Sequence, residues 1–194
     1  MCLRKVTVGL LILFPLFMIL DSCGGSRSTP PGYASGRTVY LKYNIHAQQG
    51  PRDCKASYAN WTNPGTGHFI IPVNTPVEIG TFKRGFSFII KDDGRKVFFE
   101  FHPRNMAMSV DQYIDLITSP TKVSLKGISE KDHKGIREGK AYIGMTKKGV
   151  MRALGYPATH KTPSLEANTW VYWKNRFSTM VVEFDQNGKV KRVQ

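Results

Sequence analysis

The distribution of apolar residues divides the chain into three parts. Val6 to Leu20 contains no charged residue, and residues 37–103 show short apolar runs with partial alternation. Residues 109–154 contain apolar positions at helical spacing. Alternation is typical of half-buried strands, whereas i, i+3, i+4, i+7 spacing is typical of amphipathic helices. The pattern therefore predicts an N-terminal apolar segment, a β-rich part and a mixed C-terminal part.

The β-rich part is expected to contain several short strands. Thr38–Ile45 is rich in β-forming residues, and Val77–Phe82 alternates cleanly. Asp92-Asp93-Gly94 separates two apolar runs and predicts a hairpin, because Asp-Gly tolerates the positive φ of a tight turn. Residues 121–127 are expected to form one more strand.

Three polar residues mark the starts of predicted helices. Ser109 and Ser129 each begin a capping box, and Thr146 is a favourable N-cap. Pro120 and Gly155 are expected to stop the first and last of these helices. Three C-terminal strands should follow, which we expect at Thr169–Arg176, Phe177–Asp185 and Lys189–Val193.

These elements predict an α+β fold, with an N-terminal β-rich module followed by a two-helix, three-stranded antiparallel domain. The expected domains are a signal peptide at 1–22, a flexible Gly/Ser/Pro-rich tether at 23–36, the β-rich module at 37–127 and the second domain at 128–194. The role of the β-rich module cannot be inferred from its residues.

The N-terminus is typical of a bacterial lipoprotein signal. Arg4 and Lys5 precede the apolar run, and Cys23 follows a small residue. The 15 residues from Val6 to Leu20 are fewer than the ~20 that span a bilayer, which favours a cleaved signal over a permanent anchor. Cys23 is therefore the predicted lipid-attachment residue. An ordinary secreted protein, in which Cys23 and Cys54 could pair, is the main alternative.

The mature chain is expected to be strongly basic. The whole sequence has 28 basic and 14 acidic residues, and removing Arg4, Lys5 and Asp21 leaves 26 and 13, a net charge of +13. This charge favours acidic partners such as anionic lipids, lipopolysaccharide or acidic protein faces. A generally basic, solvated surface is the simpler interpretation. Nucleic acid is not expected as a partner of an exported chain.

No catalytic motif is recognisable in the sequence. The five histidines lack metal-ligand spacing, and no cofactor or metal is predicted. Cys54 could pair with a histidine as a nucleophile, but a minor structural thiol is the preferred interpretation. The chain is therefore predicted not to be an enzyme.

Residues 170–177 combine aromatic rings with cations. Alternate strand residues share a face, which places Trp170, Tyr172 and Arg176 on one side and Trp173 on the other. One side should cover the helices, and the other could contact a partner unless both are simply covered. Two lysines in the first turn after Thr146 oppose the helix dipole, as expected for an acidic partner or a solvated helix start. The candidate partner-binding residues are Lys147, Lys148, Trp170, Tyr172, Trp173 and Arg176.

Residues 144–157 resemble the helix-and-turn signature of the SmpA/OmlA lipoprotein family. Trp170-Val171-Tyr172 and Val182–Val190 resemble the family's aromatic strand and closing hairpin. The resemblance covers residues 128–194 and implies a BamE-like domain, with two helices packed on a three-stranded antiparallel sheet. It also implies attachment to the outer membrane, facing the periplasm, and a non-enzymatic role beside outer-membrane assembly proteins.

The chain also departs from the family pattern. Small members lack the stretch 37–127, and Gly149 stands where the family often has an acidic residue. The expected function is a membrane-anchored periplasmic scaffold or interaction module in outer-membrane protein assembly or envelope integrity. The alternative is a periplasmic ligand- or enzyme-binding, inhibitor-like protein.

Overall fold

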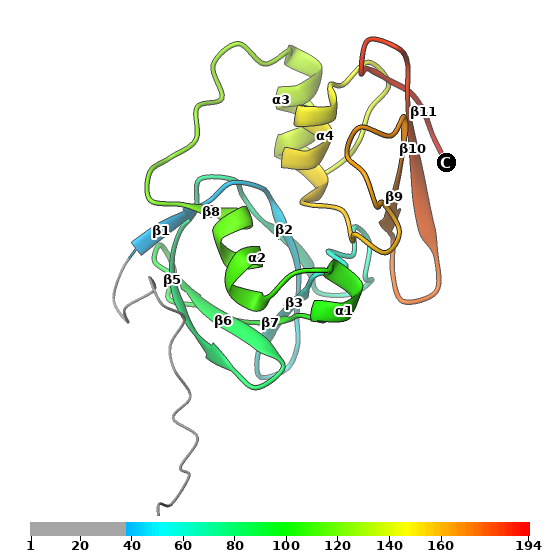
Figure 1. The fold of residues 1–194 in the computed structure, drawn as a ribbon. Helices are drawn as coiled ribbons and strands as arrows, with labels where there is room; N and C mark the ends of the chain where they lie inside the picture. The colour runs from blue at the N-terminus through cyan, green and yellow to red at the C-terminus, as the bar shows by residue number, and fades with distance from the viewer. Residues whose placement is uncertain (1–37) are drawn as a thin grey trace, which may run out of the picture.

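The computed structural model describes residues 38–194, which form two sheets and several short helices (Figure 1). The larger sheet is mixed and curled, and its eight strands are, in spatial order, β4 (His68–Ile71), β2 (Ile45–Gln49), β3 (Cys54–Ser57), β7 (Lys96–Glu100), β6 (Gly85–Ile90), β5 (Pro76–Phe82), β1 (Thr38–Leu41) and β8 (Thr118–Ser119). The smaller sheet is antiparallel and contains β11 (Val190–Val193), β10 (Thr179–Phe184) and β9 (Thr169–Trp173).

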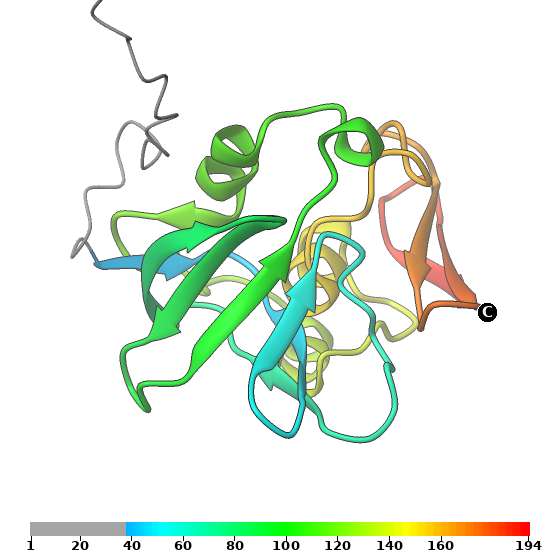
Figure 2. The same ribbon diagram turned by 90° about the horizontal axis from the view of Figure 1, so that it is seen from below.

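Helices α1 (Pro103–Met106) and α2 (Val110–Ile117) cover one face of the larger sheet (Figure 2). The capping box at Ser109 is confirmed, because its hydroxyl accepts from the Gln112 backbone and the Gln112 side chain accepts from the Ser109 backbone. Tyr113 and Ile114 of α2 are almost fully buried, and the Tyr113 ring packs 5.6 Å from that of Phe99. Burial of these side chains closes the first hydrophobic core.

Helices α3 (Glu130–Glu138) and α4 (Lys147–Leu154) lie between the two sheets (Figure 1). The predicted caps at Ser129 and Thr146 are confirmed, and both helices begin where the sequence indicates. Their apolar sides meet the smaller sheet in a second core that includes Val150, Trp170 and Phe184.

Buried polar side chains join α3 and α4 to the larger sheet as well. The amide of Asn44 donates to Ile136 O at 2.7 Å and to Ala153 O at 3.2 Å. His46 of β2 also contacts Ala153 O, at 3.1 Å through Nε2. Unpaired carbonyl groups at helix ends need such partners when they are buried. The two helices therefore pack on the smaller sheet and are also hydrogen-bonded to the larger sheet.

The fold class predicted from the sequence is wrong. The described residues form a mostly β structure with an eight-stranded mixed sheet, a three-stranded sheet and four short helices. This is not a β-module followed by a two-helix, three-stranded BamE-like domain. The pattern of apolar residues locates helices and strands, but it cannot show that buried amides dock the two C-terminal helices on the larger sheet.

Two strand predictions also need correction. Residues 121–127 form no strand, because Asn74 takes the place of a strand partner: its Oδ1 accepts from Val123 N at 2.7 Å and its Nδ2 donates to Val123 O at 3.0 Å. The single strand expected at Thr38–Ile45 is divided into β1 and β2. The break lies at residues 42–44, where the Asn44 backbone N–H donates to Arg152 O.

The hairpin predicted at Asp92-Asp93-Gly94 is confirmed, since β6 and β7 pair on either side of it and Gly94 has a φ of +73°. Strands β3 and β7 are parallel, with Cys54 opposite Val97. None of the helices within residues 38–194 is long and apolar enough to cross a membrane. The predicted signal peptide, tether and lipid-attachment residue Cys23 lie outside the described residues.

Candidate functional site

An open groove of about 570 Å³ lies where the two sheets meet. Residues from β3, β7 and the loop after β3 line one side, and the end of β9 with the following turn lines the other. We call it the inter-sheet groove and define it by its aromatic and charged residues, Tyr58, Trp61, Arg84, Glu100, Trp173 and Arg176, together with Ser57, Ala59 and His102. The groove thus collects rings and cations from distant parts of the chain.

The loop between β3 and β4 positions Trp61. Two consecutive backbone groups in this loop bind the end of β9, because Thr62 N donates to Trp173 O at 3.0 Å and Asn63 N donates to Lys174 O at 2.7 Å. On the other side, Asn60 accepts from His46 N at 2.8 Å and donates to Leu154 O. The loop is therefore fixed to both sheets, and it holds the indole ring at their junction.

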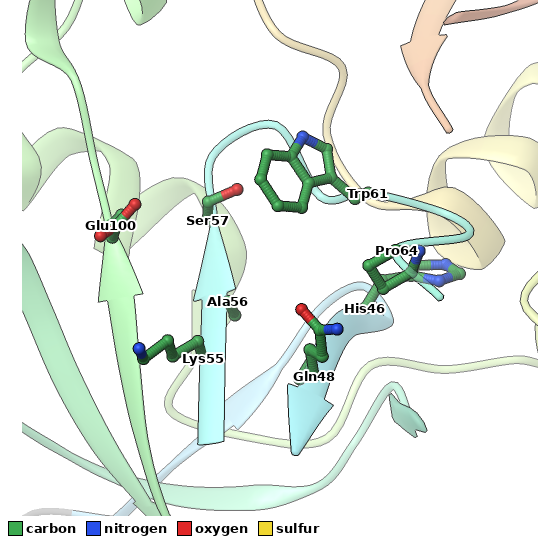
Figure 3. A pocket seen from close by; sticks show the side chains of 9 residues that line it. His46, Gln48, Lys55, Ala56, Ser57, Trp61, Pro64 and Glu100 are labelled. Carbon is green, nitrogen blue, oxygen red and sulfur yellow. The ribbon is translucent and has the colours of Figure 1, made fainter. Parts of the chain in front are cut away.

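A smaller pocket of about 190 Å³ continues the groove over strands β2 and β3. Figure 3 shows Trp61 and Pro64 of the loop on one side and the strand residues Gln48 and Lys55 on the other. This pocket shares Ser57, Trp61 and Glu100 with the groove. A third depression, of about 160 Å³, extends from Lys55 to the rings of Phe82 and Phe98. Together they form one surface across the outer face of the larger sheet.

The three depressions together contain three cations, Lys55, Arg84 and Arg176, and two carboxylates, Asp53 and Glu100. Arg84 and Glu100 form an ion pair at 2.9 Å, with side chains 69% and 39% exposed. An ion pair this exposed contributes little to stability, so Arg84 can exchange partners at small cost. Within residues 38–194, Lys55 and Arg176 have no acidic side chain at ion-pair distance. The surface is therefore suited to a ligand that carries negative charge.

Two of the candidate residues from the aromatic strand line the groove, and two do not. Trp173 and Arg176 lie in it, and both are at least partly exposed. Trp170 and Tyr172 are only 1% and 2% exposed and belong to the second core. Trp170 Nε1 donates to Leu165 O at 3.2 Å, and burial raises the pKa of the Tyr172 phenol well above its ordinary value. These two side chains stabilise the fold and offer no surface to a partner.

The two candidate lysines of α4 also differ from each other. Lys147 donates to Leu165 O at 3.1 Å and to Glu166 O at 2.9 Å, and its Nζ lies 5.8 Å from the centroid of the Trp170 ring. The Lys147 ammonium group is therefore bound by groups of the protein itself. Lys148 is exposed, but it does not line the groove.

Cys54 is poorly placed for nucleophilic chemistry. It is 3% exposed, its Sγ donates to Gln49 Oε1 at 2.9 Å, and burial raises the pKa of the thiol. A raised pKa leaves less of the reactive thiolate at neutral pH. Within residues 38–194, no three histidine, cysteine or acidic side chains converge as metal ligands.

The sequence reasoning missed Tyr58, Trp61, Arg84 and Glu100. A tryptophan inside the loop of residues 58–67, which is rich in Gly, Asn and Pro, was the available signal, since exposed loop aromatics often bind ligands. Arg84 and Glu100 carried no such signal, because only strand pairing brings them beside the loop.

Comparison with known proteins adds nothing to this geometry: no family model, curated protein or solved structure matches the chain. The resemblance to SmpA/OmlA lipoproteins stays a prediction from short sequence motifs.

Proposed function

We propose that the chain is a membrane-tethered, non-enzymatic interaction module that holds another component of the cell envelope in the inter-sheet groove. The observation that carries this proposal is the groove itself, where Trp61, Trp173 and Arg176 lie together at a rigid junction. Tryptophan, tyrosine and arginine dominate the energetics of binding surfaces.

The orientation of the molecule supports this role. The described chain begins at Thr38 in β1, on the side of the larger sheet away from the smaller sheet (Figure 1). Strand β1 is four positions from β3 in the sheet, which corresponds to about 19 Å along it at the usual strand spacing. The groove therefore lies at some distance from the point where the described chain begins, which would leave it accessible in a chain tethered through Cys23.

The location and the partner in this proposal rest on sequence motifs. Lipidation of Cys23, attachment to the outer membrane on its periplasmic side and contact with outer-membrane assembly proteins follow from the signal sequence and the family resemblance. Basic residues would engage anionic lipid head groups as a secondary contact. The alternative function, a periplasmic ligand- or enzyme-binding protein, is favoured by the 190 Å³ pocket beside the groove, which has the polar and aromatic lining of a small-molecule site.

Site-specific photo-crosslinking in cells tests the proposal. A photoreactive phenylalanine derivative is placed in the full chain at Trp61 or Arg176, within the groove, and at Ile143 or Gln186, which are exposed elsewhere. We expect an adduct of the same component from both groove positions and none from the control positions. Equal adducts from all four positions, or none from the groove, would contradict the proposal.

The identity of the adduct separates the two functions. An outer-membrane assembly protein would support the scaffold role, and its yield should fall in Cys23→Ser, which cannot be lipidated. A soluble periplasmic enzyme or a small ligand captured equally by Cys23→Ser would support the alternative.

A further inference from the structure

We infer that the inter-sheet groove and its side pocket bind a glycan chain with free carboxylates, such as cell-wall glycan from which the stem peptides have been removed. This inference rests on the proposed function, because it names the ligand of the same groove. Three features carry it: partly exposed aromatic rings, cations without acidic partners, and the lack of a strand edge within the groove on which a peptide could pair.

The aromatic rings suit sugars. Trp61, Trp173 and Tyr58 are all partly exposed in the groove, so each ring offers apolar area to a ligand. Lys161 Nζ lies 5.1 Å from the centroid of the Trp173 ring, and the His160 ring lies 6.2 Å from it, so both groups help to hold the indole in place. A flat apolar ring with polar groups beside it matches a pyranose, whose C–H face is apolar and whose edge is hydroxylated.

Polar groups for the hydroxyls lie in the side pocket. Gln48 uses its Nε2 to donate to Thr66 O at 2.9 Å, which leaves its Oε1 free to accept from a hydroxyl. The Ser57 side chain lies between this pocket and the groove, where its hydroxyl can donate or accept. Sugar rings placed successively along the surface would meet both.

The cations require a ligand with negative charge. Lys55 in the side pocket and Arg176 in the groove have no acidic partner in the described part of the chain. Arg84 joins them if it exchanges Glu100 for a ligand carboxylate, with which its guanidinium can form paired hydrogen bonds. Cations spaced along an extended surface fit carboxylates repeated along a polymer.

A peptide ligand fits less well. Strand β3 is paired with β2 on one side and β7 on the other, so its backbone is not available. The outer edge of β9 is occupied, because Val171 N donates to Thr162 Oγ1 at 2.9 Å and the loop after β3 binds the end of the strand. An extended peptide therefore cannot add as a strand, and the charged lining does not match the apolar groove that a helix requires.

The periplasmic location proposed for the chain makes the cell wall the expected source of such a glycan. The full chain, purified in detergent, is titrated by calorimetry with three probes. These are a tetrasaccharide of alternating N-acetylglucosamine and N-acetylmuramic acid, the neutral N-acetylglucosamine tetramer and a poly-glutamate peptide. We expect the carboxylated tetrasaccharide to bind at least fivefold more tightly than the neutral tetramer, and poly-glutamate to bind more weakly than either.

Matched variants locate the binding. Trp61→Ala and Arg176→Gln should each weaken the affinity for the carboxylated tetrasaccharide at least fivefold, and Trp61→Phe should retain most of it. Ile143→Ala and Lys126→Gln remove an exposed apolar side chain and an exposed charge outside the groove, and should leave the affinity unchanged. Urea unfolding of each variant shows whether a loss of binding comes from a loss of folding.

The inference is overturned if the neutral tetramer binds equally well, if poly-glutamate binds more tightly, or if the groove variants bind like wild type. Failure of glycan binding together with a protein adduct in the crosslinking experiment overturns this inference alone. Failure of both experiments overturns the proposed function as well.

Discussion

Gly149 is required because a buried carboxylate occupies the space where a side chain would lie. Asp132 is fully buried, and its Oδ1 and Oδ2 accept from the Thr146 N–H and hydroxyl at 2.8 and 3.1 Å. A Cβ at position 149 would lie 1.9 Å from Asp132 Oδ1. Asp132 of α3 thus places a negative charge at the N-terminus of α4. The dipole of α4 favours a negative charge at that end.

Gly149→Ala should consequently destabilise the protein, although alanine is the better helix former. Because neither the helix backbone nor the hydrogen-bonded carboxylate can move freely, we expect a loss of about 2 kcal/mol, within the range of overpacked cores. Urea denaturation measures it. Lys148→Ala, at the neighbouring exposed position, is the control and should change stability by less than about 0.5 kcal/mol. A Gly149→Ala protein as stable as wild type would show that the helix and carboxylate can separate.

His46 connects three elements through a ring that must stay neutral. Its Nε2 lies 3.1 Å from Ala153 O, which can only accept, so Nε2 carries the proton. Its Nδ1 must then accept from His68 Nε2 at 3.0 Å. Burial lowers the pKa of His46 to about 4 and also lowers that of His68. Protonation of His46 would place a positive charge in a buried site and would require His68 to move its own proton from Nε2 to Nδ1.

This arrangement predicts that the protein loses stability in mild acid. Because the folded pKa lies below the unfolded value of about 6.5, the unfolded state binds the proton first as pH falls. Stability is therefore complete above about pH 6.5 and declines toward pH 4, by about 2 kcal/mol between pH 7 and pH 5 for His46 alone. Urea unfolding at both pH values measures the loss.

His46→Gln removes the titrating group and should flatten the dependence on pH, whereas His102→Gln, at an exposed position, should leave it as in wild type. An unchanged slope in His46→Gln would assign the effect to other groups.

At the scale of elements, local signals predicted the three longer helices and the hairpins, and missed α1 and the strands held by distant partners. Ser109, Ser129 and Thr146 correctly marked three helix starts, because capping depends on nearby residues. Strand β3, with the sequence Cys-Lys-Ala-Ser, carries no strong β signal and forms because β2 and β7 pair with it. The parallel pairing of β3 with β7 joins segments that are distant in the sequence, so no short stretch of sequence could indicate it.

In the candidate site, too, features set by nearby residues were predicted and features set by distant partners were not. Alternation along β9 separates Trp170 and Tyr172 from Trp173, and aromatic and basic composition correctly drew attention to this segment. Composition could not say which face is covered, so two core residues were selected with the groove residues. Trp61 joins Trp173 across more than a hundred residues through backbone hydrogen bonds of the loop, which no periodicity reveals.

Asn44 is the side chain on which the docking of elements most depends. Besides the two helix carbonyls, its Oδ1 accepts from Val73 N at 2.9 Å. Asn44→Leu keeps a similar volume, leaves Val73 N without its acceptor at a cost of about 1–3 kcal/mol, and removes one hydrogen bond each from Ile136 O and Ala153 O. We expect a total loss of about 3 kcal/mol in urea unfolding. Asn168→Leu, at an exposed position, is the matched control. A small loss in Asn44→Leu would mean that water or a backbone shift replaces the amide.

At the scale of the whole molecule, the two sheets are joined on both sides of α4. Asn44, just before β2, and His46, within β2, bind carbonyl groups at its C-terminal end, and the loop after β3 binds β9. The groove lies between the two sheets, so its shape depends on these contacts. A boundary between residues 127 and 128, predicted from the sequence, would cut through this network.

Separate expression of residues 38–127 and 128–194 tests whether that boundary divides independent domains. The second piece would expose Ile136, Ala153 and Leu154 carbonyls that now accept from Asn44, His46 and Asn60, and domains this short have small cores. We expect residues 38–194 to unfold in one cooperative thermal transition by circular dichroism, and neither piece to show a sharp transition alone. A cooperative transition in residues 128–194 by themselves would mean that the buried amides are dispensable and that the groove joins two independent units.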